Sequence, residues 1–459
     1  MKKQIGVVLA LTTLLASLMV GSQAAVKTGA ACKVAGQSQV VQGKKYLCVK
    51  SGKKLVWGKG VLVSAPKPTT KASPTPTPSA SPTVTPTPTP SATPAPIVDP
   101  LSECKLSVLD GRGDVAIGGW PRISARSKTT GVVNATVVMV DFPDAPAKMT
   151  PQDAFAKVEG ATDVFTEVSY GNLQYSFKPQ FKWYRMSKES KSYAPLNKSF
   201  ATHREYIAEA IALADGDVDF SKTDNIIVLA NPDSTGIGNS GPAFAALGSY
   251  GITVDGNTIM NGATSSHDLN YWKSIWLNHE ITHAMGLPDL YAFTTGNSAN
   301  PYDGLRYTGE FSYMGLSSYE SNSPSLFAFE RWNLGWIDDS QVVCSKAVGQ
   351  KHTITAVEVK SGLKAVLIPL DFSRALVVES RRAVGLDKKM SKVGAVVYLV
   401  DSAIQSGRGP IQVYPINLTG DPRYLSAPRA VGEKVSVEGY SITVVAADAT
   451  TDTIEISKG

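Results

Sequence analysis

The residues whose types and spacing have the clearest chemistry lie between positions 279 and 289, where the sequence reads His-Glu-Ile-Thr-His-Ala-Met-Gly-Leu-Pro-Asp. Two histidines four positions apart fall on one face of a helix, one turn from each other. Both imidazoles can therefore reach one zinc ion, and the glutamate beside the first can act as general base on a zinc-bound water. The pattern predicts His279 and His283 as zinc ligands and Glu280 as the base.

The residues that follow the second histidine extend this pattern. Gly286 breaks the helix and lets the chain turn back, which places Asp289 where it can supply a third ligand. The alternative is a buried helix whose histidines are hydrogen-bonded core residues. The chain has only five histidines, so the ligand spacing of two of them favours the metal site.

The elements that must position this motif show an α/β order. We expect its helix to begin near Asp268 or Asn270, with Trp272 and Trp276 on the same face as the two histidines. The earlier segments are predicted from their apolar patterns: strands at 135–143 and 225–230, helices at 151–158 and 204–214, and an edge strand within 245–258. A substrate could pair with that edge strand.

The chain from about residue 346 to 459 changes character. Short alternating strands separated by Gly, Asp and Pro are expected at 352–357, 364–368, 374–380, 395–400, 441–446 and 453–456. This pattern predicts a C-terminal β-sandwich-like domain, in which the sequence shows no chemistry. The zinc motif then belongs to a catalytic domain at 101–345.

The N-terminal hundred residues have three parts. Residues 1–24 read as a signal peptide, with Lys2 and Lys3, an apolar stretch and small residues before Ala25. Residues 25–63 form a small two-cysteine β module with three short strands, and 64–100 form a linker of Pro, Thr, Ser and Ala. We expect a secreted protein, free or associated with the cell envelope, without a transmembrane helix.

The net charge of +6 conceals an asymmetry. Residues 1–100 hold twelve lysines and one acid, whereas the remainder holds 33 basic and 38 acidic residues. The basic module at 25–63 therefore suits an anionic cell-wall polymer, or else it is simply a solvated lysine surface. We do not expect a nucleic-acid partner.

Four cysteines fit an oxidising compartment and allow three pairings. We favour Cys32 with Cys48 and Cys104 with Cys344, because each bridge then closes one domain. The alternative is that Cys104, just before the catalytic domain, ligates zinc in a latent form.

Several further blocks resemble the immune inhibitor A-like family of secreted bacterial zinc metalloproteases. The blocks lie at 140–144, 169–173, 279–291, 309–315 and 331–336. The resemblance implies a metzincin-like zinc endopeptidase of the α/β (α+β) class, with Met314 in a turn that packs under the imidazoles. Members often carry an acid at the positions of Leu290 or Ala292, so Asp289 remains the main third ligand and Glu310 a weaker one.

The same resemblance suggests roles for other side chains. Calcium often stabilises such exported enzymes, and Asp141, Asp144 and Asp303 are candidate ligands. Tyr319 or Tyr291 is a candidate for stabilising the oxyanion during hydrolysis of protein or peptide substrates. Two alternatives are an envelope-binding pseudo-enzyme, which would not need Glu280, and a zinc hydrolase of glycans or esters.

Overall fold

The computed structural model describes residues 27–28, 30–32, 38–41, 44–51, 54–58, 61–62, 99–107, 119–239, 241–293, 300–316, 318, 320–415 and 420–459. Contacts divide the chain into two compact units, Met1–Thr93 and Pro94–Gly459. The predicted signal peptide and nearly all of the predicted linker lie outside the described residues. In the described part of the chain, no helix has the length and apolar character needed to cross a membrane.

The first unit contains a small antiparallel sheet. Its strands are β1 (Ser38–Val41), β2 (Lys44–Ser51), β3 (Lys54–Trp57) and β4 (Val61–Leu62), and β2 pairs with the other three. Cys48 and Trp57 are opposite each other in the register and both are buried. Cys32 forms a disulfide with Cys48, which fastens the segment before the sheet to its central strand. Binding to an anionic polymer stays a prediction for this module.

The zinc motif belongs to a mixed α+β region built on a five-stranded sheet. The sheet has the order β6-β5-β7-β11-β8, from strands β5 (Gly131–Asp141), β6 (Leu173–Arg185), β7 (Asn225–Ala230), β8 (Ala243–Ala245) and β11 (Asn261–Thr264). The first four strands are parallel, and β8 runs antiparallel at the edge. The predicted strands at 135–143 and 225–230 correspond to β5 and β7, whereas β6 was not predicted.

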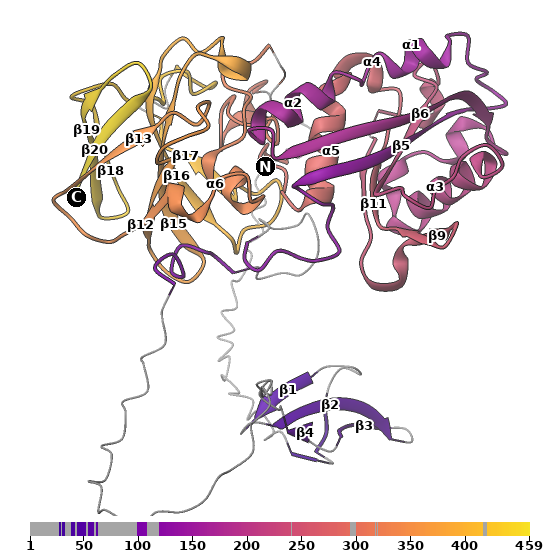
Figure 1. Cartoon of the computed structure of the whole chain (residues 1–459), viewed down its shortest axis with the longest axis horizontal. Coiled ribbons are helices and arrows are strands. Elements are labelled where there is room, and N and C mark those ends of the chain that lie inside the picture. The colour runs from indigo at the N-terminus through magenta and orange to yellow at the C-terminus, as the bar shows by residue number, and fades with distance from the viewer. Residues whose placement is uncertain are drawn as a thin grey trace, which may run out of the picture. The chain divides into compact units, whose positions relative to one another are not determined.

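Helices cover both faces of this sheet (Figure 1). They are α1 (Pro151–Phe155), α2 (Ala161–Val168), α3 (Phe200–Ala214), α4 (Leu269–Trp272) and α5 (Ser274–Met285). Val138 and Val140 of β5 share a core with α3, whereas Val137 and Met139 share a core with α2 and α5. Successive side chains of a strand point to opposite faces, so residues 137–140 of β5 are apolar on both faces.

Two local predictions were only partly right. Residues 252–259 form a separate hairpin of β9 (Ile252–Val254) and β10 (Asn257–Ile259), because Asp255 and Gly256 both adopt positive φ and close a two-residue turn. The edge strand is β8, which precedes most of the predicted segment. The predicted helix begins directly after Asp268, as expected, but is interrupted at Lys273, whose φ is +50°. The Asp268 carboxylate accepts hydrogen bonds from Ser266 and does not cap the helix through its side chain.

The remainder of the second unit contains two further sheets. One has the order β12-β14-β15-β16-β17 and the other β13-β20-β19-β18. The strands are β12 (Val342–Cys344), β13 (Gln350–Thr355), β14 (Ala365–Pro369), β15 (Arg374–Arg381), β16 (Gly394–Asp401), β17 (Ile411–Val413), β18 (Lys434–Val437), β19 (Tyr440–Ala447) and β20 (Thr451–Lys458). Leu376 and Val397 of the first sheet share a core with Ile442 and Ile454 of the second, so the two sheets form a sandwich.

The first sheet of this sandwich also packs against the region that carries the predicted zinc motif. Val377 and Tyr398, on its other face, share a core with Phe329 of α6 (Ala328–Asn333) and with Leu277 of α5. In Figure 1 this sheet and α6 lie between α3 and the β18–β20 sheet. The change of sequence character near residue 345 therefore marks a change of sheet within one compact unit.

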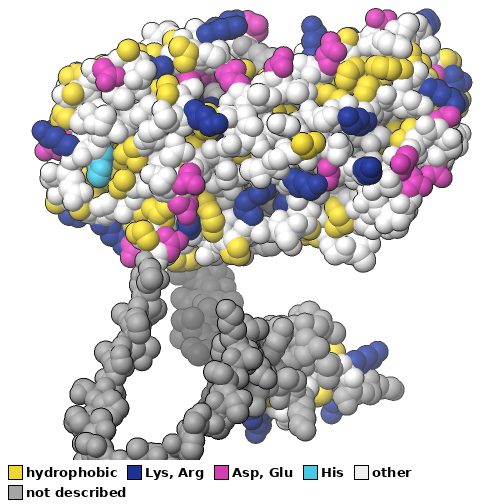
Figure 2. All heavy atoms as spheres, viewed as in Figure 1, with side chains coloured by type: hydrophobic (Ala, Val, Ile, Leu, Met, Phe, Trp, Pro, Cys, Tyr) yellow, Lys and Arg dark blue, Asp and Glu magenta, His cyan; other side chains and the backbone are white. Residues whose placement is uncertain are grey.

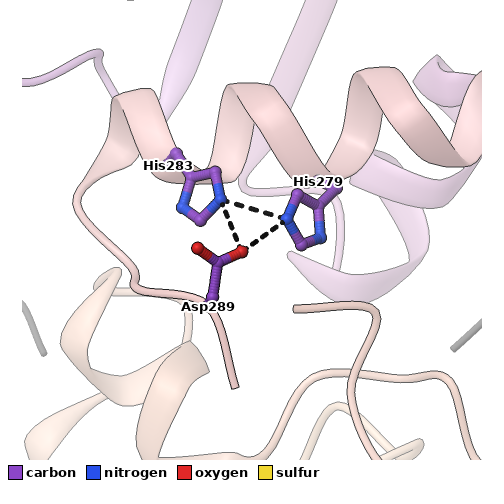
Figure 3. Close-up of side chains that lie close together, drawn as sticks. All are labelled: His279, His283 and Asp289. Carbon is purple, nitrogen blue, oxygen red and sulfur yellow. Dashed lines mark hydrogen bonds and ion pairs between the residues drawn. The ribbon is translucent and has the colours of Figure 1, made fainter. Parts of the chain in front are cut away.

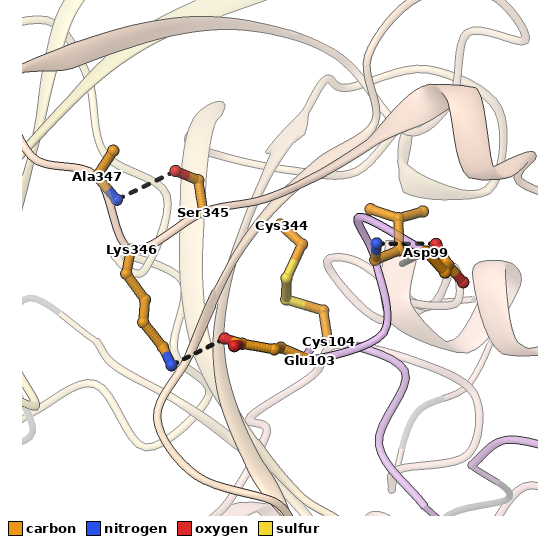
Figure 4. Close-up of a disulfide and its surroundings, with 8 residues drawn as sticks. Asp99, Glu103, Cys104, Cys344, Ser345, Lys346 and Ala347 are labelled. Carbon is orange, nitrogen blue, oxygen red and sulfur yellow. Dashed lines mark hydrogen bonds and ion pairs between the residues drawn. A yellow bond between two sulfur atoms is a disulfide. The ribbon is translucent and has the colours of Figure 1, made fainter. Parts of the chain in front are cut away.

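A disulfide joins the start of this unit to the sandwich (Figure 4). Cys104 is bonded to Cys344 of β12, with Cα atoms 5.9 Å apart. Beside it, Glu103 forms a 2.8 Å ion pair with Lys346. Both favoured pairings are confirmed, and the alternative role of Cys104 as a latent zinc ligand is wrong because its sulfur is bonded to Cys344.

Charges of both signs are interspersed over the face of this unit shown in Figure 2. Several exposed charges on the unit form ion pairs, including Lys182 with Asp217 at 2.6 Å and Arg374 with Asp371 at 2.8 Å. The face in view therefore has no extended area of a single sign, in keeping with the near balance of acids and bases after residue 100.

Candidate metal centre

Three of the predicted site residues converge (Figure 3). The Nε2 atoms of His279 and His283 are 3.0 Å apart, and the Asp289 Oδ1 atom lies 3.1 Å from the first and 3.2 Å from the second. Across the described residues, no other group of three or more His, Cys, Asp or Glu side chains gathers in a way that could hold a metal ion.

The backbone determines which nitrogen of each imidazole faces this point. His279 Nδ1 lies 2.7 Å from the Tyr313 carbonyl oxygen, and His283 Nδ1 lies 2.7 Å from that of Leu287. A carbonyl can only accept a hydrogen bond, so each Nδ1 carries a proton and donates it. In the neutral imidazoles both Nε2 atoms then present lone pairs.

Three electron-pair donors therefore face one another without a proton between them. Such an arrangement is repulsive unless a cation lies among the three atoms. Tetrahedral zinc ligands at about 2.0–2.1 Å from the metal are about 3.3 Å from one another, close to the separations seen here. Two neutral imidazoles and one carboxylate suit zinc, and both imidazoles have the outer hydrogen bonds typical of zinc ligands.

The chain reversal after α5 explains how Asp289 returns to the histidines. Gly286 adopts a φ of +111° and its N–H donates to the carbonyls of Thr282 and His283. A glycine in this left-handed conformation ends a helix at low cost. Arg122 donates to the Met285 carbonyl at 2.9 Å and so satisfies part of the helix end.

Asp289 is held on both its backbone and its carboxylate. Its N–H donates to Ser406 Oγ at 2.8 Å, and Ser406 Oγ donates to Asp289 Oδ2 at 3.0 Å. Burial alone would raise the pKa of the Asp289 carboxyl, but the two neighbouring histidines outweigh burial and lower this pKa. The carboxylate is therefore anionic at neutral pH. Ser406 was not predicted, because a serine in a loop 117 residues away has no sequence signal.

Glu280 lies beside the three candidate metal ligands and lines a cleft of about 500 Å3. Burial raises its pKa to about 7, against the opposing effect of the two histidines. The Ala243 backbone, in edge strand β8, hydrogen-bonds the carboxylate. Glu280 is thus positioned between the metal ligands and the strand that borders the cleft.

The segment around Met314 packs against the candidate site. Met314 is fully buried, and its carbonyl accepts a 2.7 Å hydrogen bond from Leu290 N–H. Its neighbour Tyr313 provides the carbonyl that orients His279. The turn at 312–315 therefore contacts both α5 and the segment that carries Asp289. From the sequence, only the Met314 side chain was expected to have a supporting role.

The remaining predicted site residues have different positions. The Tyr291 ring lies 6.1 Å from that of His279, measured between centroids, and lines the cleft. Tyr319 lies outside the described residues. Glu310 is not part of the converging group, because its carboxylate forms a 2.5 Å ion pair with Arg423.

The three proposed calcium ligands are held by protein groups. Asp141 pairs with Arg185 at 2.6 Å, Asp303 pairs with Arg306 at 2.6 Å, and Asp144 accepts two hydrogen bonds from Ser190. Among the described residues, none of the three belongs to a group of three or more His, Cys, Asp or Glu side chains that could hold a metal ion. A calcium role stays a prediction without geometric support.

Comparisons with known proteins add little to this geometry. No protein-family model matches the chain, and no curated protein matches it in sequence. Among solved structures, metalloproteinase-II from Bacteroides fragilis matches with 16% identity and a TM-score of 0.24, over 50% of this chain and 59% of that one. The chain thus spans less than two thirds of that neighbour, and a likeness of this degree carries no functional inference.

Proposed function

We propose that this chain is a secreted zinc-dependent endopeptidase, similar in its metal site to the metzincins. The observation that carries the proposal is the convergence of His279, His283 and Asp289 through three unprotonated atoms. Glu280 lies beside them, on the wall of a cleft that the edge strand also borders. A hydrogen-bonded structural core would not place three acceptor atoms against one another.

The chain's own residues have distinct roles in this proposal. His279, His283 and Asp289 would hold zinc, which when bound polarises a carbonyl and lowers the pKa of water. Glu280 takes a proton from the attacking water and delivers it to the leaving amine. Burial raises the pKa of Glu280, which favours a carboxylate that accepts a proton and then releases it.

The edge strand favours a peptide substrate. β8 is the last strand of its sheet, and Gly241, Pro242 and Ala243 line the cleft. An extended peptide can add to such an edge through main-chain hydrogen bonds, which a glycan or simple ester cannot reproduce. The Tyr291 hydroxyl is our candidate for stabilising the carbonyl oxygen during attack.

Export is supported by the two disulfides, since such bonds are typical of proteins that fold in oxidising compartments. The signal peptide and membership of the immune inhibitor A-like family stay predictions.

The proposal is tested with Glu280→Gln in the full mature chain loaded with zinc. We expect kcat/KM on a mixed peptide library to fall by about 10²–10⁴-fold, with bound zinc unchanged by elemental analysis. Glu205→Gln, an exposed position on α3, is the matched control and should cleave as wild type. The endopeptidase proposal is wrong if wild type and Glu280→Gln cleave equally, or if zinc-loaded wild type cleaves no peptide.

A further inference from the structure

The loop between β16 and β17 reaches from the sandwich to the metal centre. Ser406 lies in this loop, is 9% exposed and touches Asp289 at two atoms. Next to it, Gly407 N–H donates to the Asp289 carbonyl at 3.0 Å, and Phe293 N–H donates to the Gly407 carbonyl at 3.0 Å. The loop therefore pairs with the segment that carries the third ligand.

Only one assignment of hydrogen-bond donors and acceptors is possible at the Ser406 hydroxyl. A backbone N–H can only donate, so the hydroxyl oxygen must accept the bond from Asp289 N–H. The one hydroxyl proton is then available for Asp289 Oδ2, which accepts it at 3.0 Å. Oδ2 is thereby occupied, and Oδ1 is the carboxylate atom that faces the two Nε2 atoms.

The loop is well fixed at both its tip and its base. Gly407 has a φ of +68°, and a Cβ atom there would lie 2.3 Å from the Phe293 ring, so only glycine allows this approach. At the base, Ser402 N–H donates to the Ser373 carbonyl at 2.9 Å within the sandwich. The position of Ser406 is thus determined by the β-rich part of the unit.

We propose that Ser406 is a positioning residue of the metal centre, which fixes Asp289 so that Oδ1 alone binds the metal. The inference rests on the proposed zinc centre but does not depend on peptide hydrolysis. The β-rich region, in which the sequence shows no chemistry, then completes the metal site. An outer hydrogen-bond partner of a metal ligand typically contributes 10–100-fold to metal affinity.

The test compares zinc dissociation constants of full mature chains by competition with a chromogenic chelator. Ser406→Ala should bind zinc about 10–100-fold more weakly, and Ser406→Thr, which keeps the hydroxyl, should restore most of the affinity. Ser402→Ala is the matched control, because Ser402 is a buried serine of the same loop whose hydroxyl bonds Ser373 and not Asp289. The absorption spectrum of the cobalt-substituted chains should change for Ser406→Ala and not for Ser402→Ala.

Each outcome decides the proposal. Weaker zinc binding by Ser406→Ala, with the thermal stability of the metal-free chain preserved, supports it. Unchanged zinc affinity, an equal loss in Ser402→Ala, or a Ser406→Ala chain that is unfolded without metal would assign the hydroxyl to the scaffold and overturn it. If wild type binds zinc and Ser406→Ala weakens that binding while no peptide is cleaved, the endopeptidase proposal fails and this inference stands.

Discussion

Two buried polar clusters of the Pro94–Gly459 unit differ in how their donors and acceptors match. Around Arg381, which is fully buried, the guanidinium donates to Glu379 at 2.5 Å and to Asp387 at 2.6 Å. The second Glu379 oxygen accepts from the Ala328 N–H and the second Asp387 oxygen from the Ser325 N–H. Here each acceptor meets a donor, whereas at the metal centre three acceptors meet one another.

The difference separates a cluster in which two carboxylates pair with a protein cation from one whose three facing atoms are all acceptors. Burial acts to lower the pKa of Arg381, but the charges of Glu379 and Asp387 have a larger opposite effect and raise this pKa above its ordinary value. The cluster therefore supplies its own cation. In the cluster of His279, His283 and Asp289 the three facing atoms are all acceptors when both imidazoles are neutral, and the group contains no Lys or Arg. Matched donors thus indicate a structural role, and converging lone pairs indicate a metal site.

The largest effect is expected from His283→Asn. Asparagine can keep a donor near the place of Nδ1, and so the hydrogen bond to the Leu287 carbonyl, but it has no atom at the place of Nε2. We expect zinc affinity to fall by well over the roughly 100-fold that an outer partner contributes, measured by chelator competition. Urea unfolding in EDTA should give nearly the wild-type free energy, because the metal-free chain loses one of three mutually repelling acceptors.

The contrast between a metal site and a structural cluster would not hold if His283→Asn still bound zinc, or if the substitution unfolded the metal-free chain. The first result would mean that the acceptors do not bind the metal. The second would mean that the imidazole contributes to the core in the same way as Arg381.

Arg381→Met should show the opposite behaviour. It leaves Glu379 and Asp387 buried without their cation, and breaking a buried pair in this way costs about 3–5 kcal/mol of unfolding free energy. Zinc affinity of the folded fraction should be unchanged. Urea unfolding and chelator competition on the same preparation measure both quantities, and a stable Arg381→Met chain would contradict the structural role of this cluster.

The sequence predicted the part of the metal centre that depends on local geometry. The i, i+4 spacing of His279 and His283 and the left-handed turn at Gly286 are properties of one helix and its end. They were sufficient to place Asp289 near the histidines, as the structure shows. The two buried strands β5 and β7 were also predicted, because each is a continuous apolar run.

The parts that were missed depend on contacts between distant segments. Ser406 and the Tyr313 carbonyl reach the site through tertiary packing, and neither a common serine nor a backbone oxygen has a sequence pattern. β6 was missed because Lys178, Pro179 and exposed polar residues interrupt its apolar pattern along an edge of the sheet. The break at Lys273 needs a positive φ that the residue type does not suggest.

The smallest expected effect concerns His203 and the pH dependence of the unfolding free energy. This buried histidine has an ordinary partner, since its Nε2 lies 2.7 Å from Thr264 Oγ1, and burial lowers its pKa to about 4. The unfolded chain binds a proton near pH 6.5 but the folded chain does so only near pH 4, so unfolding takes up a proton between these values. Stability should therefore fall as the pH decreases across this window, by up to about 3 kcal/mol.

The variant His203→Gln lacks this contribution, and its urea unfolding free energy in EDTA should depend less steeply on pH between 7 and 4 than that of wild type. Both chains carry the same remaining ionisable groups, so the difference isolates His203. Parallel curves would show that His203 is not held neutral in the folded chain.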